Sequence, residues 1–106
     1  MKTFHKARTE CLMVLRYFYK HPYKELAYLK LEDVPTLKES LSSEECLLLE
    51  TYLLLREAKM RLFTMDPGIL FCTHGGQKMS PMAMHAQVSK LLEEVDPTTS
   101  KTGPRS

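Results

Sequence analysis

The stretch that most constrains the fold is residues 42–63, SSEECLLLETYLLLREAKMRLF, the longest apolar-rich segment of the chain. Ser42 and Glu45 have the Ser-x-x-Glu spacing of a capping box, in which each side chain accepts a hydrogen bond from a backbone N–H at a helix start. Glu45 in the first turn and Lys59 in the last suit the helix dipole. We therefore predict one long buried helix, roughly 30 Å in length at about 1.5 Å per residue.

Leucines surround much of this predicted helix. A three/four-residue rhythm indicates its inward face, and further leucines widen that face. The positions in the rhythm are Leu47, Leu48, Tyr52, Leu55, Ala58, Lys59 and Leu62, with Leu49, Leu53 and Leu54 beside them. Because so apolar a helix must be covered on more than one side, we predict that the other helices pack around it.

Three further helices are predicted. The first spans residues 4–20, and the second spans 22–31 after a break at Pro22. The last begins at Ser80-Pro81 and runs to about Glu94. Serine at the N-cap followed by proline in the first turn is typical of a helix start. The apolar positions that we expect to face inward are Phe4, Ala7, Cys11, Val14, Leu15 and Phe18 in the first helix, Tyr23, Leu26 and Leu29 in the second, and Met84, Val88, Leu91, Leu92 and Val95 in the last.

The remaining segments connect these helices. Residues 35–42 are interpreted as a connector with at most one helical turn, and the run 69–73, bounded by glycines, is the best strand candidate. We predict a mainly α-helical single domain over residues 1–95, with four nearly antiparallel helices and at most one short strand or hairpin near 69–73. The polar residues 96–106 are predicted to form a disordered tail.

The composition indicates an intracellular protein, nuclear or cytoplasmic. No apolar run reaches the roughly 18 residues that a membrane span needs, so we expect no membrane partner. The charged N-terminus lacks the apolar core of a secretory signal. Cys11, Cys46 and Cys72 are odd in number and widely spaced, as is typical of reduced thiols.

The net charge of +2 is unevenly distributed. Residues 1–30 hold seven Lys/Arg and two Glu, a local charge of +5, whereas residues 32–57 hold seven acids and two bases, a local charge of −5. The two segments either attract each other within one fold or present a basic face to nucleic acid.

No pattern of reactive residues indicates an enzyme, a metal site or a cofactor. Cys72, His74 and His85 lack the paired short spacings of a structural zinc site. The glycines of Gly75-Gly76-Gln77-Lys78 are too few for a phosphate-binding loop and are interpreted as a turn.

Two pieces of the chain resemble the catalytic domain of tyrosine recombinases, the phage-integrase-like family, and especially the degenerate recombinases of crypton transposons. The first piece is KELAYLKLEDV at residues 24–34. The second runs from residue 42 and includes SSEECLLLETYL and ILFCTHGGQKMSPMAMHAQVSKLLEEV. The resemblance implies a helical, transposon-derived domain related to DNA recombination and DNA integration.

The catalytic parts of that family are unmatched. Pro22 stands where the family's catalytic arginine is expected, and the residues between Val34 and Ser42 are too few for the hairpin that bears a catalytic lysine. The family's His-x-x-Arg box and tyrosine nucleophile would fall beyond residue 106. Phosphoryl transfer needs a cationic clamp on the phosphate and a positioned nucleophile, so the resemblance implies a truncated, catalytically inactive remnant.

Two functions follow as hypotheses. The first is weak DNA binding without catalysis, with contacts from Lys6, Arg8, Arg16, Lys20, Lys24 and Lys30 and from Lys78 in the glycine turn. The alternative is a helical protein–protein interaction module without a nucleic-acid role, which packs with a helical partner or with itself because the long helix has more apolar surface than so short a chain can cover.

Overall fold

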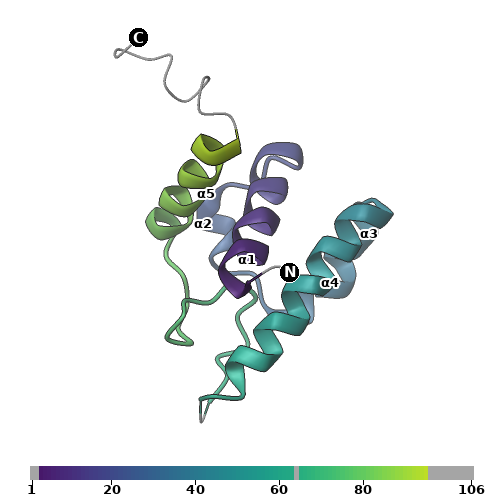
Figure 1. The fold of residues 1–106 in the computed structure, drawn as a ribbon. Coiled ribbons are helices and arrows are strands. Elements are labelled where there is room, and N and C mark those ends of the chain that lie inside the picture. The colour runs from purple at the N-terminus through teal and green to yellow at the C-terminus, as the bar shows by residue number, and fades with distance from the viewer. Residues whose placement is uncertain (1–2, 64, 96–106) are drawn as a thin grey trace.

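The computed structural model describes residues 3–63 and 65–95, and this part of the chain is mainly helical (Figure 1), which confirms the predicted fold class. The predicted tail at 96–106 and the side chain of Val95 lie outside the described residues. The helical elements are α1 (Phe4–Met13), a π-helix (Val14–Phe18), α2 (Tyr23–Leu26), a 3-10 turn (Leu31–Asp33), α3 (Val34–Ser40), α4 (Ser43–Met60) and α5 (Pro81–Val95).

Both predicted helix caps are confirmed. At the start of α4, the Glu45 amide donates to Ser42 Oγ at 3.2 Å, and the Ser42 amide donates to Glu45 Oε1 at 2.9 Å. At the start of α5, the Ala83 amide donates to Ser80 Oγ at 3.1 Å. These side chains satisfy backbone donors that a helix cannot pair internally, so the two starts are determined locally.

The predicted connector at 35–42 is instead helical, since α3 occupies Val34–Ser40. Pro35 lies in its first turn, where the missing amide proton of proline costs no hydrogen bond.

The second predicted helix, residues 22–31, ends early. Its α-helical part is only α2, because the following backbone pairs with a distant segment. The Leu70 amide donates to the Leu29 carbonyl at 2.8 Å, and the Leu31 amide donates to the Gly68 carbonyl at 2.9 Å. These long-range bonds require an extended backbone and therefore compete with continuation of the helix.

The strand candidate at 69–73 bends at Leu70 and Phe71 and forms only isolated bridges. Lys30 pairs with Ile69, and Cys72 pairs with Lys78, both antiparallel. In the part of the chain that the structure describes, no regular strand forms, which agrees with the prediction of at most one short strand or hairpin.

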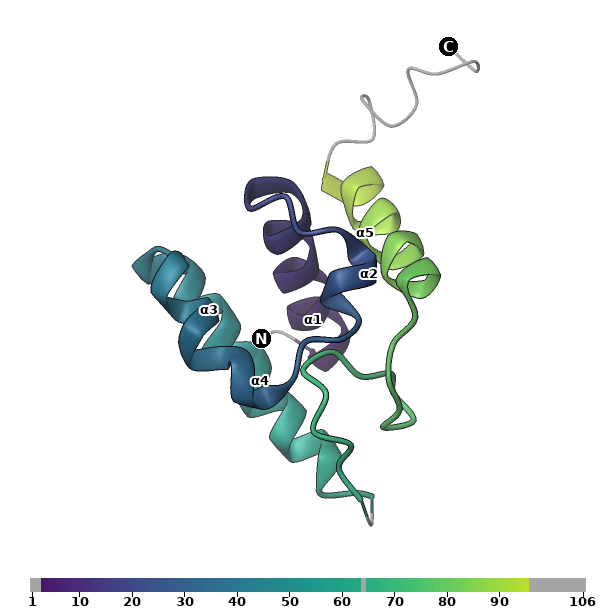
Figure 2. The same ribbon diagram turned by 180° about the vertical axis from the view of Figure 1, so that it is seen from behind.

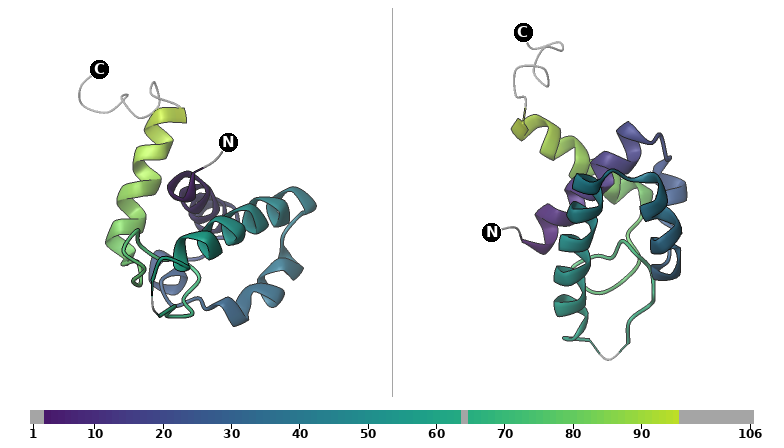
Figure 3. Two further views of the ribbon diagram at one scale, coloured as in Figure 1. Left: turned by 60° about the horizontal axis from the view of Figure 1, so that its bottom comes forward. Right: turned by 90° about the vertical axis from the view of Figure 1, so that its right-hand side faces the viewer.

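The central helix is α1, not the long α4 that we predicted. α1 packs against α4 on one side and α5 on the other. Six of its ten residues are buried, so it is covered on more than one face. Figure 3 shows α4 and α5 diverging from α1 in different directions, so the predicted nearly antiparallel arrangement is also wrong.

The inward face of α4 differs from the predicted one. Its buried residues are Leu49, Tyr52, Arg56 and Met60, whereas Leu47 and Leu54 are 64% and 70% exposed. Leu62, just beyond the helix, is 75% exposed. Leucine surrounds the helix, so periodicity could not select the one side that α1 covers.

Buried polar side chains hold the non-helical segment 69–72 within the core. The Tyr52 ring lies 5.7 Å from Phe4 and 5.5 Å from Phe71, and its hydroxyl donates to the Leu70 carbonyl at 2.7 Å. Arg56 donates to the Ile69 carbonyl at 2.7 Å and forms two hydrogen bonds to Asp66. These bonds satisfy carbonyls that have no helix or sheet partner.

Candidate nucleic-acid interface

Exposed lysines and aromatic rings gather around α2 and the segments beside it. Figure 2 shows α2 at the front of the molecule, between α1 and α5. We define the basic–aromatic surface by its members, Arg16, Tyr17, Phe18, Lys20, Lys24, Tyr28, Lys30 and Lys78.

The π-helix turns two aromatic rings outward. Tyr17 and Phe18 are 42% and 68% exposed, so the prediction that Phe18 faces the core is wrong. A π-helix closes its hydrogen bonds over five residues instead of four, and its wider turn shifts the following side chains around the axis. The α-helical spacing that runs inward from Phe4 to Leu15 therefore fails at Phe18.

Lys20 ends this helix in a left-handed conformation, with φ of 63°. The amide of His21 donates to the Leu15 carbonyl at 3.0 Å, which satisfies a carbonyl of the π-helix. Helices often end in this way, although glycine usually occupies the left-handed position. The turn redirects the chain into α2 and leaves the Lys20 side chain exposed.

Arg16 is held between two tyrosines. Its guanidinium carbon lies 5.5 Å from the centroid of the Tyr17 ring and 5.4 Å from that of Tyr23. Burial, together with the neighbouring Tyr17, raises the pKa of Tyr23 to about 12. Tyr23 therefore stays neutral at physiological pH, and its ring offers Arg16 a cation–π contact at the base of the surface.

Lys78 and Tyr28 form a second cation–aromatic pair. The Lys78 ammonium lies 3.4 Å from the centroid of the Tyr28 ring, which is itself 64% exposed. The two isolated bridges fix this arrangement, because Lys30 pairs with Ile69 and Lys78 pairs with Cys72. Segment 69–72 thus pairs with both Lys30 and Lys78, which are far apart in sequence.

The surface carries an excess of positive charge. Residues 14–30 contain four Lys/Arg and a single acid, Glu25, and Lys78 adds one more cation. The Glu25 carboxylate is 2.7 Å from His21 Nδ1. Such a charge excess attracts phosphate groups in a salt-dependent way.

Five of the seven predicted DNA-contact residues lie in or next to the π-helix and α2, or against Tyr28: Arg16, Lys20, Lys24, Lys30 and Lys78. Lys6 is exposed but lies ten residues before Arg16, about 15 Å along the helix. Lys6 lines a small hollow with His5 and Lys90, away from the basic–aromatic surface.

The prediction for Arg8 is wrong. Its side chain is only 3% exposed, Nη1 donates to the Cys72 carbonyl at 2.7 Å, and its guanidinium lies 5.2 Å from the centroid of the Phe4 ring. Arg8 falls on the face of α1 that covers segment 69–72, so it is a core residue and cannot reach a phosphate on the surface.

Sequence reasoning missed the aromatic members, Tyr17, Phe18 and Tyr28. A signal was present, because four of the five tyrosines of the chain lie between residues 17 and 28, among Arg16, Lys20 and Lys24. Interleaved aromatic and basic residues are typical of surfaces that bind single-stranded nucleic acid.

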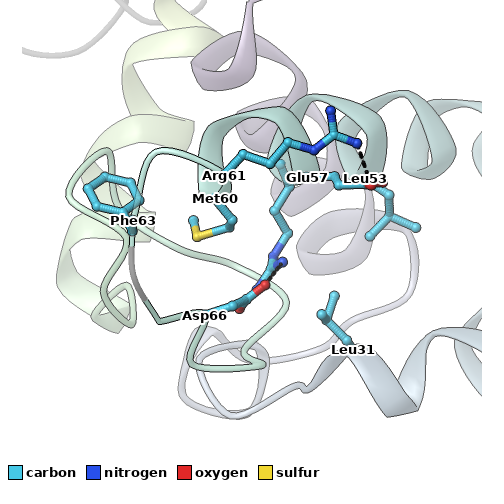
Figure 4. Close-up of a pocket in the computed structure, with 8 residues that line it drawn as sticks. Leu31, Leu53, Glu57, Met60, Arg61, Phe63 and Asp66 are labelled. Atoms are coloured by element: carbon cyan, nitrogen blue, oxygen red, sulfur yellow. Dashed lines mark hydrogen bonds and ion pairs between the residues drawn. The ribbon is translucent and has the colours of Figure 1, made fainter.

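A groove of about 560 Å³ beside the end of α4 is the other notable concavity (Figure 4). Leu31, Leu53, Met60 and Phe63 supply its apolar lining. Its charged residues pair with one another, Arg56 with Asp66 and Arg61 with Glu57. With their charges already neutralised, these side chains give a small polar ligand little to bind.

The described residues show neither a metal-binding site nor an environment that would activate the Cys72 thiol. They contain no group of three or more His, Cys, Asp or Glu that could hold a metal ion. Cys72 is buried, and burial raises the pKa of its thiol, which disfavours the reactive thiolate.

Comparison of the chain with protein-family models, with curated proteins and with solved structures finds no match. The resemblance to tyrosine recombinases therefore stays a prediction. Within residues 3–63 and 65–95, no helix combines the length and the apolar character needed to cross a membrane.

Proposed function

We propose that this chain binds single-stranded DNA weakly and without sequence preference through the basic–aromatic surface, and that it catalyses no reaction on the DNA. The observation that carries this proposal is the contact of Lys78 with the exposed ring of Tyr28, 3.4 Å from ammonium to ring centroid. A cation held against an exposed ring can meet a phosphate while the ring stacks on a base.

Exposed aromatic rings favour a single strand over a duplex. In a duplex the bases are stacked on one another, so a protein ring reaches only the backbone or the groove edges. In a single strand the base faces are accessible, and stacking on a protein ring contributes about 1–3 kcal/mol per base. Tyr17, Phe18 and Tyr28 offer three such rings.

The absence of catalysis is proposed from the residues that replace the recombinase machinery. Pro22 stands at the position of the catalytic arginine, and helix α3 occupies the segment where the hairpin with the catalytic lysine would fall. A recombinase-derived chain of this kind would retain affinity for DNA without the groups that break and join the backbone.

Fluorescence anisotropy with labelled oligonucleotides tests the proposal. We expect binding to an oligo-dT strand of about 20 nucleotides at low salt. The logarithm of the observed association constant should fall with the logarithm of the salt concentration, with a slope of up to about −3.5. This limit follows because each of five cations contributes about −0.7 on a single strand. A duplex of the same length should bind more weakly. No measurable binding to either at low salt would refute the proposal.

Charge reversal locates the interface. The double variant Lys24→Glu/Lys78→Glu should lower affinity for oligo-dT by more than tenfold, whereas Lys90→Glu, an exposed site on α5 outside the surface, should lower it much less. The double variant changes the net charge by four and the single variant by two, so a loss from Lys90→Glu about half as large on a logarithmic scale would mean that net charge, and not this surface, drives binding.

A helical protein–protein interaction module is the second candidate function. The observation that favours it is the exposure of Leu47, Leu54 and Leu62 along one side of α4 and its end. Contiguous exposed apolar residues often mark a surface that another protein covers. Static light scattering over a wide concentration range tests for self-association, and its outcome is independent of DNA binding.

A further inference from the structure

A hydrogen bond joins His5 and Arg8 near the start of α1. Nη2 of Arg8 donates to Nδ1 of His5 at 3.1 Å. Because a guanidinium can only donate, His5 accepts through Nδ1 and carries its single ring proton on Nε2. A second proton on the ring could bind only at Nδ1. Protonation of His5 therefore removes the acceptor on which this hydrogen bond depends.

The side chain of Arg8 cannot move away from a protonated His5 without leaving the core. Arg8 is 3% exposed, and its Nη1 donates to the Cys72 carbonyl at 2.7 Å. In the part of the chain that the structure describes, Arg8 Nε is buried and has no hydrogen-bond partner. Protonation of His5 would leave a second donor of the same guanidinium without an acceptor and would place two cations in contact. This arrangement therefore requires His5 to be neutral.

His74 stacks on the ring of His5 from a turn that is distant in the sequence. The two ring centroids are 5.9 Å apart, and the ring planes are 11° from parallel. His74 lies in the turn at residues 73–77, between Cys72 and Lys78, which form an antiparallel bridge. His74 is exposed and can take up a proton in place, whereas His5 is half-buried. His5 thus joins the start of α1 to this turn.

Charged groups from α1, α4 and α5 surround the two histidines. They are Lys6 and Arg8 of α1, Lys59 of α4, and Lys90 and Glu94 of α5. Glu94 favours protonation but is exposed to solvent, and the basic residues oppose protonation. Burial, followed by nearby basic side chains, lowers the pKa of both His5 and His74. The surroundings of the pair thus resist the same proton that the hydrogen bond from Arg8 excludes.

We propose that His5 and Arg8 form a pH-sensitive latch, which keeps the start of α1 and the turn at residues 73–77 closed at neutral pH and releases both below about pH 6. When Nδ1 takes up a proton, the His5 ring separates from Arg8 and His74. The apolar core holds the remaining helices, so the release is local. Lys78 directly follows the released turn, so the latch connects pH to one member of the basic–aromatic surface. The latch itself does not depend on whether the chain binds DNA.

Side-chain nitrogen-15 NMR of the whole chain tests the protonation state on which the latch depends. At pH 7.5 the Nδ1 resonance of His5 should have the chemical shift of an unprotonated ring nitrogen, and the Nε2 resonance that of a protonated one. A His5 ring that carries its proton on Nδ1 at this pH overturns the proposal, because Arg8 would then have no acceptor.

Amide hydrogen exchange at pH 7.5 and pH 5.5 tests the local release, with each rate divided by that of an unstructured amide at the same pH. Ala7, Thr73 and Gly76 report on it, since their amides donate to backbone carbonyls within the latched segments. Their protection should fall by about three- to tenfold, because one proton bound by a released histidine with an ordinary pKa of about 6.5 favours opening by at most about tenfold at pH 5.5. Protection of Cys46 and Met84, at the starts of α4 and α5, should change by less than about twofold. An equal loss at all these amides would mean global destabilisation and would overturn the latch.

Three variants assign the release to His5. His5→Asn places an amide oxygen near the position of Nδ1 but cannot titrate, so protection should change by less than about twofold between the two pH values. His5→Leu lacks the acceptor and should show low protection at both. His74→Gln keeps the bond between His5 and Arg8 and should retain the loss at pH 5.5. Circular dichroism at pH 7.5 checks that each variant is folded. A loss that persists in His5→Asn and disappears in His74→Gln overturns the role of His5.

Discussion

The Arg8 guanidinium donates a hydrogen bond of 2.7 Å to the carbonyl oxygen of Cys72, 64 residues later in the chain. Together with Tyr52 and Arg56, which donate to the carbonyls of Leu70 and Ile69, Arg8 fixes a non-helical segment between helices. The same segment pairs with Lys30 and Lys78, so the polar centre of the core also positions two members of the basic–aromatic surface.

Replacing Arg8 should destabilise the fold. Arg8→Met keeps the length of the side chain but removes the donor to the buried Cys72 carbonyl, and a hydrogen bond from a charged group contributes about 1.5–3 kcal/mol. We expect urea unfolding to show that the free energy of unfolding falls by about 2 kcal/mol, because removing a charge from the core offsets part of the cost of the lost hydrogen bond. Lys6→Met also replaces a basic residue by methionine, but at an exposed position of α1. Its free energy of unfolding should stay within about 0.5 kcal/mol of that of the unmodified protein. Equal stability of the two variants would contradict a structural role for Arg8.

Tyr52→Phe removes a single hydroxyl from the core. This hydroxyl donates to the Leu70 carbonyl at 2.7 Å, and its removal leaves that buried acceptor unpaired, at a cost of about 1–2 kcal/mol in the free energy of unfolding. Combination with Arg8→Met should be non-additive, because both side chains hold the same short segment. Strict additivity in a double-mutant cycle would show that the two hydrogen bonds act independently.

Lys20 has a left-handed backbone, which costs a residue with a β-carbon about 1–2 kcal/mol. Lys20→Gly should therefore stabilise the protein by about 0.5 kcal/mol, since the greater freedom of glycine in the unfolded chain cancels part of the gain. Lys24→Gly makes the same change inside α2 and should instead destabilise by roughly 1 kcal/mol. Thermal unfolding of both variants checks the opposite signs.

Stability should fall as the pH decreases below about 6.5. The His5 and His74 rings stack with centroids 5.9 Å apart, and burial, followed by nearby cations such as Arg8, lowers the pKa of both from the ordinary value of 6.5. The unfolded chain then binds protons at a higher pH than the folded one, so stability is lost as the pH falls from about 6.5 through the folded-state pKa values.

Urea unfolding at pH 7.5 and pH 5.5 measures this loss. In the double variant His5→Gln/His74→Gln the difference between the two pH values should be smaller. The pKa of Asp66 is lowered by its hydrogen bonds from Arg56, and the pKa of Glu45 by its contact with Tyr19, so neither carboxylate should titrate in this window. An unchanged pH dependence in the double variant would assign the effect to other groups.

Aromatic and basic members of the surface should affect DNA binding differently. Tyr28→Ala removes a stacking ring and should weaken oligo-dT binding by about 1 kcal/mol without changing the salt slope. Lys24→Ala removes one phosphate contact and should reduce the magnitude of the slope by about 0.7. Anisotropy titrations at several salt concentrations separate the two effects. A salt slope that changes equally in both variants would argue against stacking by Tyr28.

Local signals in the sequence predicted local features well. The Ser42–Glu45 capping box and the Ser80-Pro81 start are formed by neighbours in the chain, so their hydrogen bonds need no tertiary context. Prediction was poorest where a distant segment competes with the helix. Leu29 and Leu31 leave the predicted helix and pair with Leu70 and Gly68, and nothing within a local window indicates those partners.

The candidate surface was likewise predicted where local sequence decides the outcome and missed where tertiary packing does. Its basic residues before Leu31 were predicted because residues 1–30 are rich in Lys and Arg, but composition cannot distinguish Arg8 in the core from Lys24 on the surface. A helix residue faces the core or the solvent according to what packs on its side of the helix. The extra residue in the π-helix turn then changes which side Phe18 occupies.

By itself the sequence determined the helical class, the starts of α4 and α5, and a basic N-terminal third, because capping, propensity and charge act between near neighbours. Only the tertiary structure decided that α1 is the central helix, that Arg8 is buried and that one leucine stripe of α4 stays exposed. Those outcomes depend on which segments meet across the fold, and the leucines of α4 are alike until α1 covers one side of it.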